Sequence, residues 1–174
     1  MKQVRAFSLA ALASLLGASA AMPQGGTATV RLRAFEEVPA ISSAGAGRFD
    51  AVISEDGQSI DYTLSYRDLK GVVSQSHLHY AQRGVNGAIF VFLCSNLGNG
   101  PAGTQACPPA PAEIHGTITA ADVLGVPAQG IPAGSLFAGL RGIRGGVVYV
   151  NVHTNLFPGG EIRGQLSFTP TEGE

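Results

Sequence analysis

Residues 48–66 read RFDAVISEDGQSIDYTLSY, and this stretch decides the fold. Apolar side chains occupy alternate positions on both sides of the turn sequence Glu55-Asp56-Gly57. These positions are Phe49, Ala51 and Ile53 before the turn and Ile60, Tyr62, Leu64 and Tyr66 after it. A period of two places such side chains on one face of a strand, and a Gly-containing turn between two such runs favours a hairpin. The stretch therefore predicts a β-hairpin whose apolar face lies on the core.

Similar short runs recur along the rest of the chain, separated by turns rich in glycine and proline. Alternating runs lie at 28–33, 113–118, 147–154 and 161–168, and the run 88–93 is continuously apolar. Ser135 to Ile143 predicts a short helix with Phe137, Leu140 and Ile143 on one face, and Thr119 to Asp122 has the form of a capping box. This spacing predicts an all-β fold: an antiparallel β-sandwich or partly closed barrel with one short helix.

The first twenty residues have the features of a secretory signal peptide. Lys2 and Arg5 precede an apolar run that is too short for a membrane anchor, and Ala18-Ser19-Ala20 forms a cleavage site. Cleavage near Ala20 would release the chain to the periplasm or outside the cell. We expect a flexible lead at 21–26, one domain at 27–169 and a flexible tail at 170–174.

Composition restricts the partners of this domain. The formal net charge is −1, charged residues make up 13% of the chain, and no basic cluster is visible in the sequence, which argues against nucleic acid. No later segment is apolar enough for a membrane span. The sequence leaves open whether the protein is a monomer or a homo-oligomer.

Cys94 and Cys107 are the two cysteines of the chain, and both lie beyond the signal peptide. An exported chain meets an oxidising compartment, so we expect a disulfide between them. The twelve intervening residues, rich in glycine and small polar side chains, cannot pack by themselves. Loop closure puts the benefit of such a bond at roughly 2 to 3 kcal/mol.

Two blocks of the sequence carry a family resemblance. They are Ser76-His77-Leu78-His79-Tyr80 followed by 84–87, and Tyr149 to Thr154 followed by 158–165; Glu37-Val38-Pro39 and 116–119 fit the same pattern. In these blocks the chain resembles the chordin-domain (CHRD) family. The resemblance implies a secreted binding or structural module. It does not extend to growth-factor binding, because the Cys-rich modules that surround the domain in chordin are missing from this sequence.

The histidines are the residues best suited to chemistry. His77, His79, His115 and His153 all fall in predicted strands, each opposite an apolar set. Residues two apart on a strand project side by side, so His77 and His79 can direct two imidazoles at one ion. His153, and His115 as a further ligand, would complete a mononuclear site suited to copper or zinc. Four histidines are too few for the two-ion site of copper-zinc superoxide dismutase, which needs six.

An alternative interpretation is that the histidines belong to a structural hydrogen-bond network. Asn151, Glu161 and Arg163 are available as partners in that network, or as residues that orient metal ligands. Convergence of three imidazoles within about 5 Å would favour the metal site, and divergence would exclude it.

Catalytic signatures are absent from the sequence. No serine lies in a Gly-x-Ser-x-Gly elbow, and both cysteines are expected to be oxidised. We therefore predict a non-catalytic module for an unidentified protein or surface ligand, with a mononuclear metal-binding protein as the alternative.

Overall fold

The computed structural model describes residues 25–171, which form nine strands, one α-helix and three short 3-10 helices. The main elements are β1 (Gly26–Arg33), β2 (Ala46–Ile53), β3 (Ile60–Arg67), β4 (Val73–Tyr80), β5 (Ala88–Ser95), β6 (Ala112–Ile118), α1 (Leu136–Arg144), β7 (Val148–Thr154), β8 (Ile162–Gln165) and β9 (Ser167–Pro170). The expected signal peptide, most of the expected lead and the last residues of the expected tail lie outside this range. Within it, no helix has the length and apolar character needed to cross a membrane.

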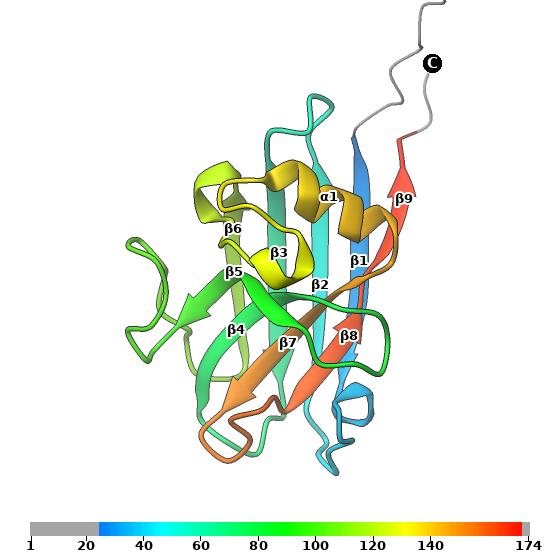
Figure 1. Cartoon of the computed structure of the whole chain (residues 1–174). Helices are drawn as coiled ribbons and strands as arrows, with labels where there is room; N and C mark the ends of the chain where they lie inside the picture. The colour runs from blue at the N-terminus through cyan, green and yellow to red at the C-terminus, as the bar shows by residue number, and fades with distance from the viewer. Residues whose placement is uncertain (1–24, 172–174) are drawn as a thin grey trace, which may run out of the picture.

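All the strands belong to one antiparallel sheet with the order β5-β4-β7-β8-β1-β2-β3-β6, and β9 pairs with β1. The sheet curls into two layers, with β6, β3, β2 and β1 behind and β5, β4, β7 and β8 crossing in front (Figure 1). Arg33 and Arg163 are paired where the layers join. This nearly closed, barrel-like sheet confirms the predicted all-β class with one short helix.

The alternating apolar residues meet between the two layers. Phe49 of β2 and Leu64 of β3 are register partners, and both are buried. Leu78 of β4 and Val150 of β7 are partners in the front layer and are equally buried. Burial of side chains of this size contributes about 1.5 to 3 kcal/mol each, which makes this double layer the main source of stability.

The predicted helix is present as α1, and Ser135 is its N-cap, because the Ser135 side chain accepts a hydrogen bond from the Ala138 backbone N–H. Its inward face carries Leu136, Leu140 and Ile143. The prediction that Phe137 shares a face with Leu140 and Ile143 is wrong: Phe137 is 60% exposed, and the Arg141 guanidinium lies 6.0 Å from its ring. The predicted capping box at Thr119 is present, but it begins a single 3-10 turn, Ala120–Asp122.

Cys94 and Cys107 form the expected disulfide. Cys94 lies in β5, and Cys107 precedes β6, so the bond joins the regions of the two edge strands of the curled sheet. The Asn96 side chain reinforces this closure by accepting from the Cys107 N–H and donating to its carbonyl.

Replacing both cysteines by alanine is expected to lower the free energy of unfolding by roughly 2 to 3 kcal/mol, because the unfolded chain regains the freedom of the closed loop. Urea unfolding of the oxidised protein and of the Cys94→Ala, Cys107→Ala variant measures the difference. A loss below about 0.5 kcal/mol would show that the Asn96 hydrogen bonds hold the edge strands without the covalent bond.

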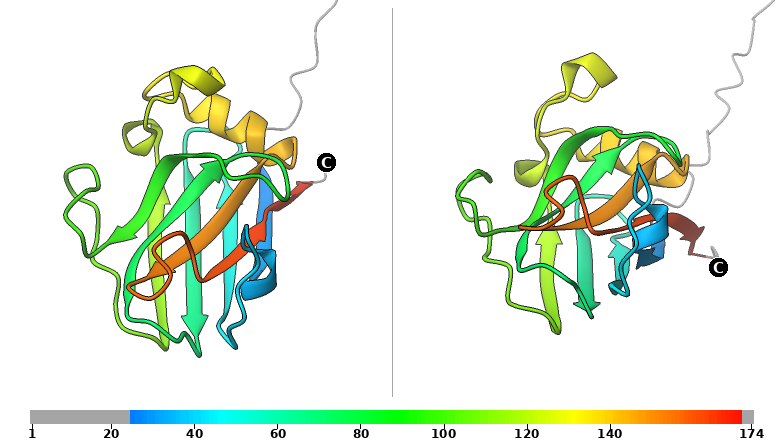
Figure 2. Two further views of the ribbon diagram at one scale, coloured as in Figure 1. Left: turned by 60° about the horizontal axis from the view of Figure 1, so that its bottom comes forward. Right: turned by 90° about the horizontal axis from the view of Figure 1, so that it is seen from below.

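The front layer has a second buried face. Along β7, Val148, Val150 and Val152 face the core, while Tyr149, Asn151 and His153 occupy the opposite face and are also buried. The loop between β4 and β5 and the turn between β7 and β8 fold over this outer face (Figure 2). A polar layer is thereby enclosed on the far side of the sheet from the apolar core.

Candidate metal centre

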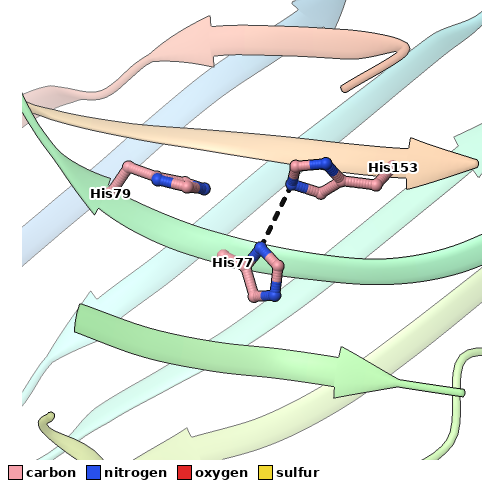
Figure 3. Close-up of side chains that lie close together, drawn as sticks. All are labelled: His77, His79 and His153. Atoms are coloured by element: carbon pink, nitrogen blue, oxygen red, sulfur yellow. Dashed lines mark hydrogen bonds between the residues drawn. The ribbon is translucent and has the colours of Figure 1, made fainter. Parts of the chain in front are cut away.

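Three histidines meet in this polar layer. His77 and His79 come from β4 and His153 comes from β7, its neighbour in the sheet. His77 lies opposite Asn151 in the register, so His153 is its diagonal neighbour on the same face. Figure 3 shows the His79 and His153 rings between the two strands, and the His77 ring over β4 with one nitrogen toward His153.

One ring nitrogen from each histidine lies within 4.8 Å of those of the other two. The closest pair is His77 Nδ1 and His153 Nε2, 3.1 Å apart (Figure 3). The convergence meets the criterion of about 5 Å set from the sequence for a metal centre.

Backbone carbonyls determine where the protons lie on two of the rings. His79 Nδ1 is 2.9 Å from the Gly87 carbonyl oxygen, and His153 Nδ1 is 2.9 Å from the Pro158 carbonyl oxygen. A carbonyl can only accept, so each Nδ1 carries the proton and each neutral ring presents the lone pair of Nε2. Metal-bound histidines are oriented in this same way, by donating the other ring N–H to a carbonyl.

Two nitrogens of the cluster have no hydrogen-bond partner among the described residues. They are Nε2 of His77 and Nε2 of His79, both buried. Leaving a buried polar atom unpaired costs about 1 to 3 kcal/mol. For His79 the unpaired atom is the lone pair that its tautomer exposes, which is the atom that a metal ion would take.

Asn151 brings an oxygen to the same place. Its Oδ1 lies 2.9 Å from His153 Nε2, which carries a lone pair in the neutral ring. Both atoms are hydrogen-bond acceptors, so their contact needs a compensating group. A cation beside them, a proton on His153, or rotation of the Asn151 amide so that Nδ2 faces His153 would each stabilise it. The donor set is therefore nitrogen-rich, with one amide oxygen at its edge.

The environment keeps the histidines in the neutral form that binds metals. Burial lowers the pKa of His77 to about 2, with the neighbouring His153 and His79 adding to the effect. Burial likewise lowers the pKa of His79 to about 4 and shifts the pKa of His153 downward. All three imidazoles are thus free of a competing proton at neutral pH.

Without metal, the protein should lose stability as the pH falls from 6.5 toward 4.5. In the unfolded chain His77 and His79 take up protons near pH 6.5, whereas in the folded chain their pKa values are about 2 and about 4. Glu37 opposes them, because burial raises its folded pKa to about 7 from 4.5. Over this range the unfolded chain therefore takes up one proton more than the folded chain. The free energy of unfolding should then fall by about 1.4 kcal/mol for each pH unit, and His153 adds to this fall.

Urea unfolding of chelator-treated protein at pH 7, 6 and 5 measures this slope. In the Glu37→Gln variant the opposing proton is absent, so the slope should steepen to about 2.7 kcal/mol per pH unit. A stability that does not change over this range would contradict the burial of neutral histidines.

Aromatic contacts fix two of the rings. The Tyr149 ring stacks on His79, with centroids 4.7 Å apart and planes 2° from parallel. The Arg163 guanidinium covers the other side of this stack, 3.4 Å from the Tyr149 centroid. Phe92 of β5 meets His77 edge-on at 4.4 Å. Side chains packed in this way hold the ring nitrogens in place.

Arg163 and Glu161 have separate tasks on β8 and the turn before it. Arg163 donates to the Val85 carbonyl and to Asn86 Oδ1, and so pins the loop between β4 and β5 over the histidines. Glu161 is fully buried and accepts from the Thr154 and Ser43 hydroxyls and from the backbone N–H groups of 70 and 71. Of the suggested metal-orienting residues, only Asn151 contacts a clustered histidine by hydrogen bonding; Glu161 belongs to the structural network.

His115 does not join the cluster. It lies on β6 in the other layer, its side chain is 68% exposed, and its Nδ1 is 3.0 Å from the Thr63 hydroxyl. The expectation that it could serve as a further ligand is therefore corrected. His115 has the same alternating pattern as the other histidines, but no loop within residues 25–171 covers the outer face of its layer (Figure 2).

Two neighbours of the site were not assigned to it from the sequence. Tyr149 stacks on His79. It lies two residues before Asn151 on β7, so the strand period could have placed it on the face of the histidines. Glu37 is 6% exposed and packs against Gly160, where φ is +127° and a β-carbon would clash with the carboxylate. Its motif, Glu37-Val38-Pro39, gave no indication of this position.

Comparison with protein families gives one match. A family model described as CHRD domain matches residues 20–166, a range that includes all three clustered histidines and both cysteines. Neither the curated proteins nor the solved structures contain a significant match.

Proposed function

This chain belongs to the CHRD domain family, and we propose that it is an exported, non-catalytic member that holds a single copper or zinc ion. The ligands are His77, His79 and His153. The observation that carries the proposal is the inward lone pair of His79 Nε2, buried and unpaired, beside two further ring nitrogens within 4.8 Å.

The distances suit one ion. Nitrogen ligands bind zinc at about 2.0 to 2.1 Å, which separates two tetrahedral ligands by about 3.3 Å. The 3.1 Å between His77 and His153 is close to that value, and the widest separation, within 4.8 Å, needs a modest contraction. Neutral imidazoles favour copper and zinc among the divalent ions, and copper binds most tightly in a given site.

Burial favours a holding role over catalysis. His77, His79 and His153 are 0%, 7% and 5% exposed, beneath loops that Arg163 and the ring N–H groups fasten. A catalytic ion needs an open coordination position that substrate can reach. The disulfide supports export, because such bonds persist in oxidising compartments.

The test is metal titration of the untagged, chelator-treated protein with copper or zinc, followed by calorimetry and native mass spectrometry. We expect one equivalent to bind with a dissociation constant below 1 μM. The His77→Ala, His79→Ala variant should bind at least 100-fold more weakly, because two of three ligands are gone. His115→Ala is the matched control, since it removes an exposed imidazole from the other layer and should bind as the wild type does.

Absence of uptake at micromolar metal, or unchanged uptake by the folded double variant, would contradict the proposal. The histidines would then form the structural hydrogen-bond network, with His77 donating to His153. Unfolding curves of each protein without metal separate loss of ligands from loss of the fold.

A further inference from the structure

The outer face of the rear layer carries a cluster of arginines. Arg31 and Arg33 of β1, Arg48 of β2 and Arg67 of β3 line one open groove of about 830 Å³, which Glu113 of β6 also lines. Along the sequence these residues are scattered, and the antiparallel register gathers them. The covering loops and α1 lie on the other side of this layer (Figure 2), which leaves the groove open to solvent.

The register places like charges side by side. Arg31 is the direct partner of Arg48, and such like-charged pairs destabilise a sheet. In the next row Arg33 and Arg67 flank Ala46, whose small side chain leaves space between the two guanidinium groups. Asp50 offsets part of this repulsion by pairing with Arg48, and an anion between the arginines would offset the remainder.

Two of the four arginines already have acidic partners. Arg48 is held by both carboxylate oxygens of Asp50 at 2.5 Å, and Arg67 pairs with Asp68. Arg31 and Arg33 have no side-chain ion pair among residues 25–171, and they lie two apart on the same strand. The α-carbons of residues two apart on a strand are about 6.5 to 7 Å apart. The two guanidinium groups are therefore positioned to bind successive anionic groups.

Hydroxyl groups continue the same face beyond the arginines. Thr27, Thr29, Thr63 and Thr117 line an adjoining open groove of about 590 Å³. Asp50 and Asp61 line this groove too, but Asp50 pairs with Arg48 and Asp61 accepts a hydrogen bond from the Thr117 hydroxyl. The nearby rings of Tyr62 and Tyr66 belong to the core, with 7% and 1% exposure, so they offer no platform for stacking nucleic-acid bases. Guanidinium groups that can bind carboxylates lie at one end of this surface, and hydroxyl groups lie at the other. This arrangement matches a ligand that alternates acidic groups and hydroxyls.

We propose that this face binds a linear carboxylated polysaccharide. Arg31 and Arg33 bind its carboxylates through two-pronged hydrogen bonds, and the threonine row binds its hydroxyls. The site lies on the opposite layer from the histidines and does not depend on metal binding.

The test is binding of the full mature protein to polygalacturonate at 50 mM salt, with neutral dextran and dextran sulfate as comparison polymers. The Arg31→Gln, Arg33→Gln variant should bind polygalacturonate at least tenfold more weakly, and the slope of log K against log salt should fall by one to two. The Arg141→Gln, Arg144→Gln variant is the matched control, because it removes the same charge from α1. It should bind as the wild type does.

Equal weakening in both variants would show that net charge alone attracts the polymer and would overturn the proposal. Failure of the wild type to bind polygalacturonate, or binding to dextran sulfate alone, would overturn it as well. Thermal unfolding of each variant confirms that the folded protein is compared, and the proposal stands or falls separately from the metal site.

Discussion

The Glu161→Ala variant is expected to lose roughly 3 to 5 kcal/mol of unfolding free energy, enough to leave little folded protein at 37 °C. The carboxylate of Glu161 accepts four hydrogen bonds, two from hydroxyls and two from the backbone N–H groups of Lys70 and Gly71. Alanine would leave these donors without an acceptor at a fully buried position. Urea unfolding at pH 7 measures the loss.

Glu161→Gln is the matched control, because it keeps the shape and one acceptor oxygen and should lose only about 1 to 2 kcal/mol. Acid should have a similar effect on the wild type. Burial acts to raise the Glu161 pKa, but the four hydrogen bonds outweigh it and hold the pKa below its usual 4.5. Its contribution is therefore present above pH 4.5 and lost as the pH falls through the folded value. Equal losses for alanine and glutamine would contradict this account.

The Arg163→Met variant is expected to lose about 3 kcal/mol and to bind the metal ion roughly tenfold more weakly. Methionine fills the space but leaves the Val85 carbonyl and Asn86 Oδ1 without a donor. It also removes the cation from the Tyr149 ring that positions His79. Chemical unfolding and metal titration on the same samples measure both effects.

Arg163→Lys keeps the charge and lacks the planar fork, so it should recover only part of the stability and of the metal affinity. Because it retains a cation beside Glu37, it separates the contribution of charge from that of stacking and hydrogen bonding. Full recovery by lysine would contradict the role given to the guanidinium plane.

Local patterns were sufficient to predict most of the strands. The alternation of 48–66 corresponds to β2 and β3, and the continuous run 88–93 lies in β5. The buried face of α1 was harder to predict, because Leu136 and Phe137 are adjacent in the sequence and both are apolar. Packing against the sheet selects Leu136, and no local signal distinguishes the two.

The candidate site could be predicted only in part. The side-by-side placement of His77 and His79 follows from the strand period, whereas their convergence with His153 depends on β4 lying beside β7. His115 shows why the remainder was inaccessible. It has the same alternation as the others, yet strand order puts it on an uncovered face. Strand order and loop coverage are non-local properties, which one-dimensional periodicity does not contain.

The order of the strands also bears on how quickly the protein folds. β7 lies between β4 and β8, and β5, β6 and α1 separate it from β4 along the chain. Such distant pairings have a high contact order, and chains dominated by them fold in milliseconds to seconds. The three-histidine cluster therefore exists only after the slowest pairings have formed. A bound ion should accordingly slow unfolding while leaving the folding rate nearly unchanged.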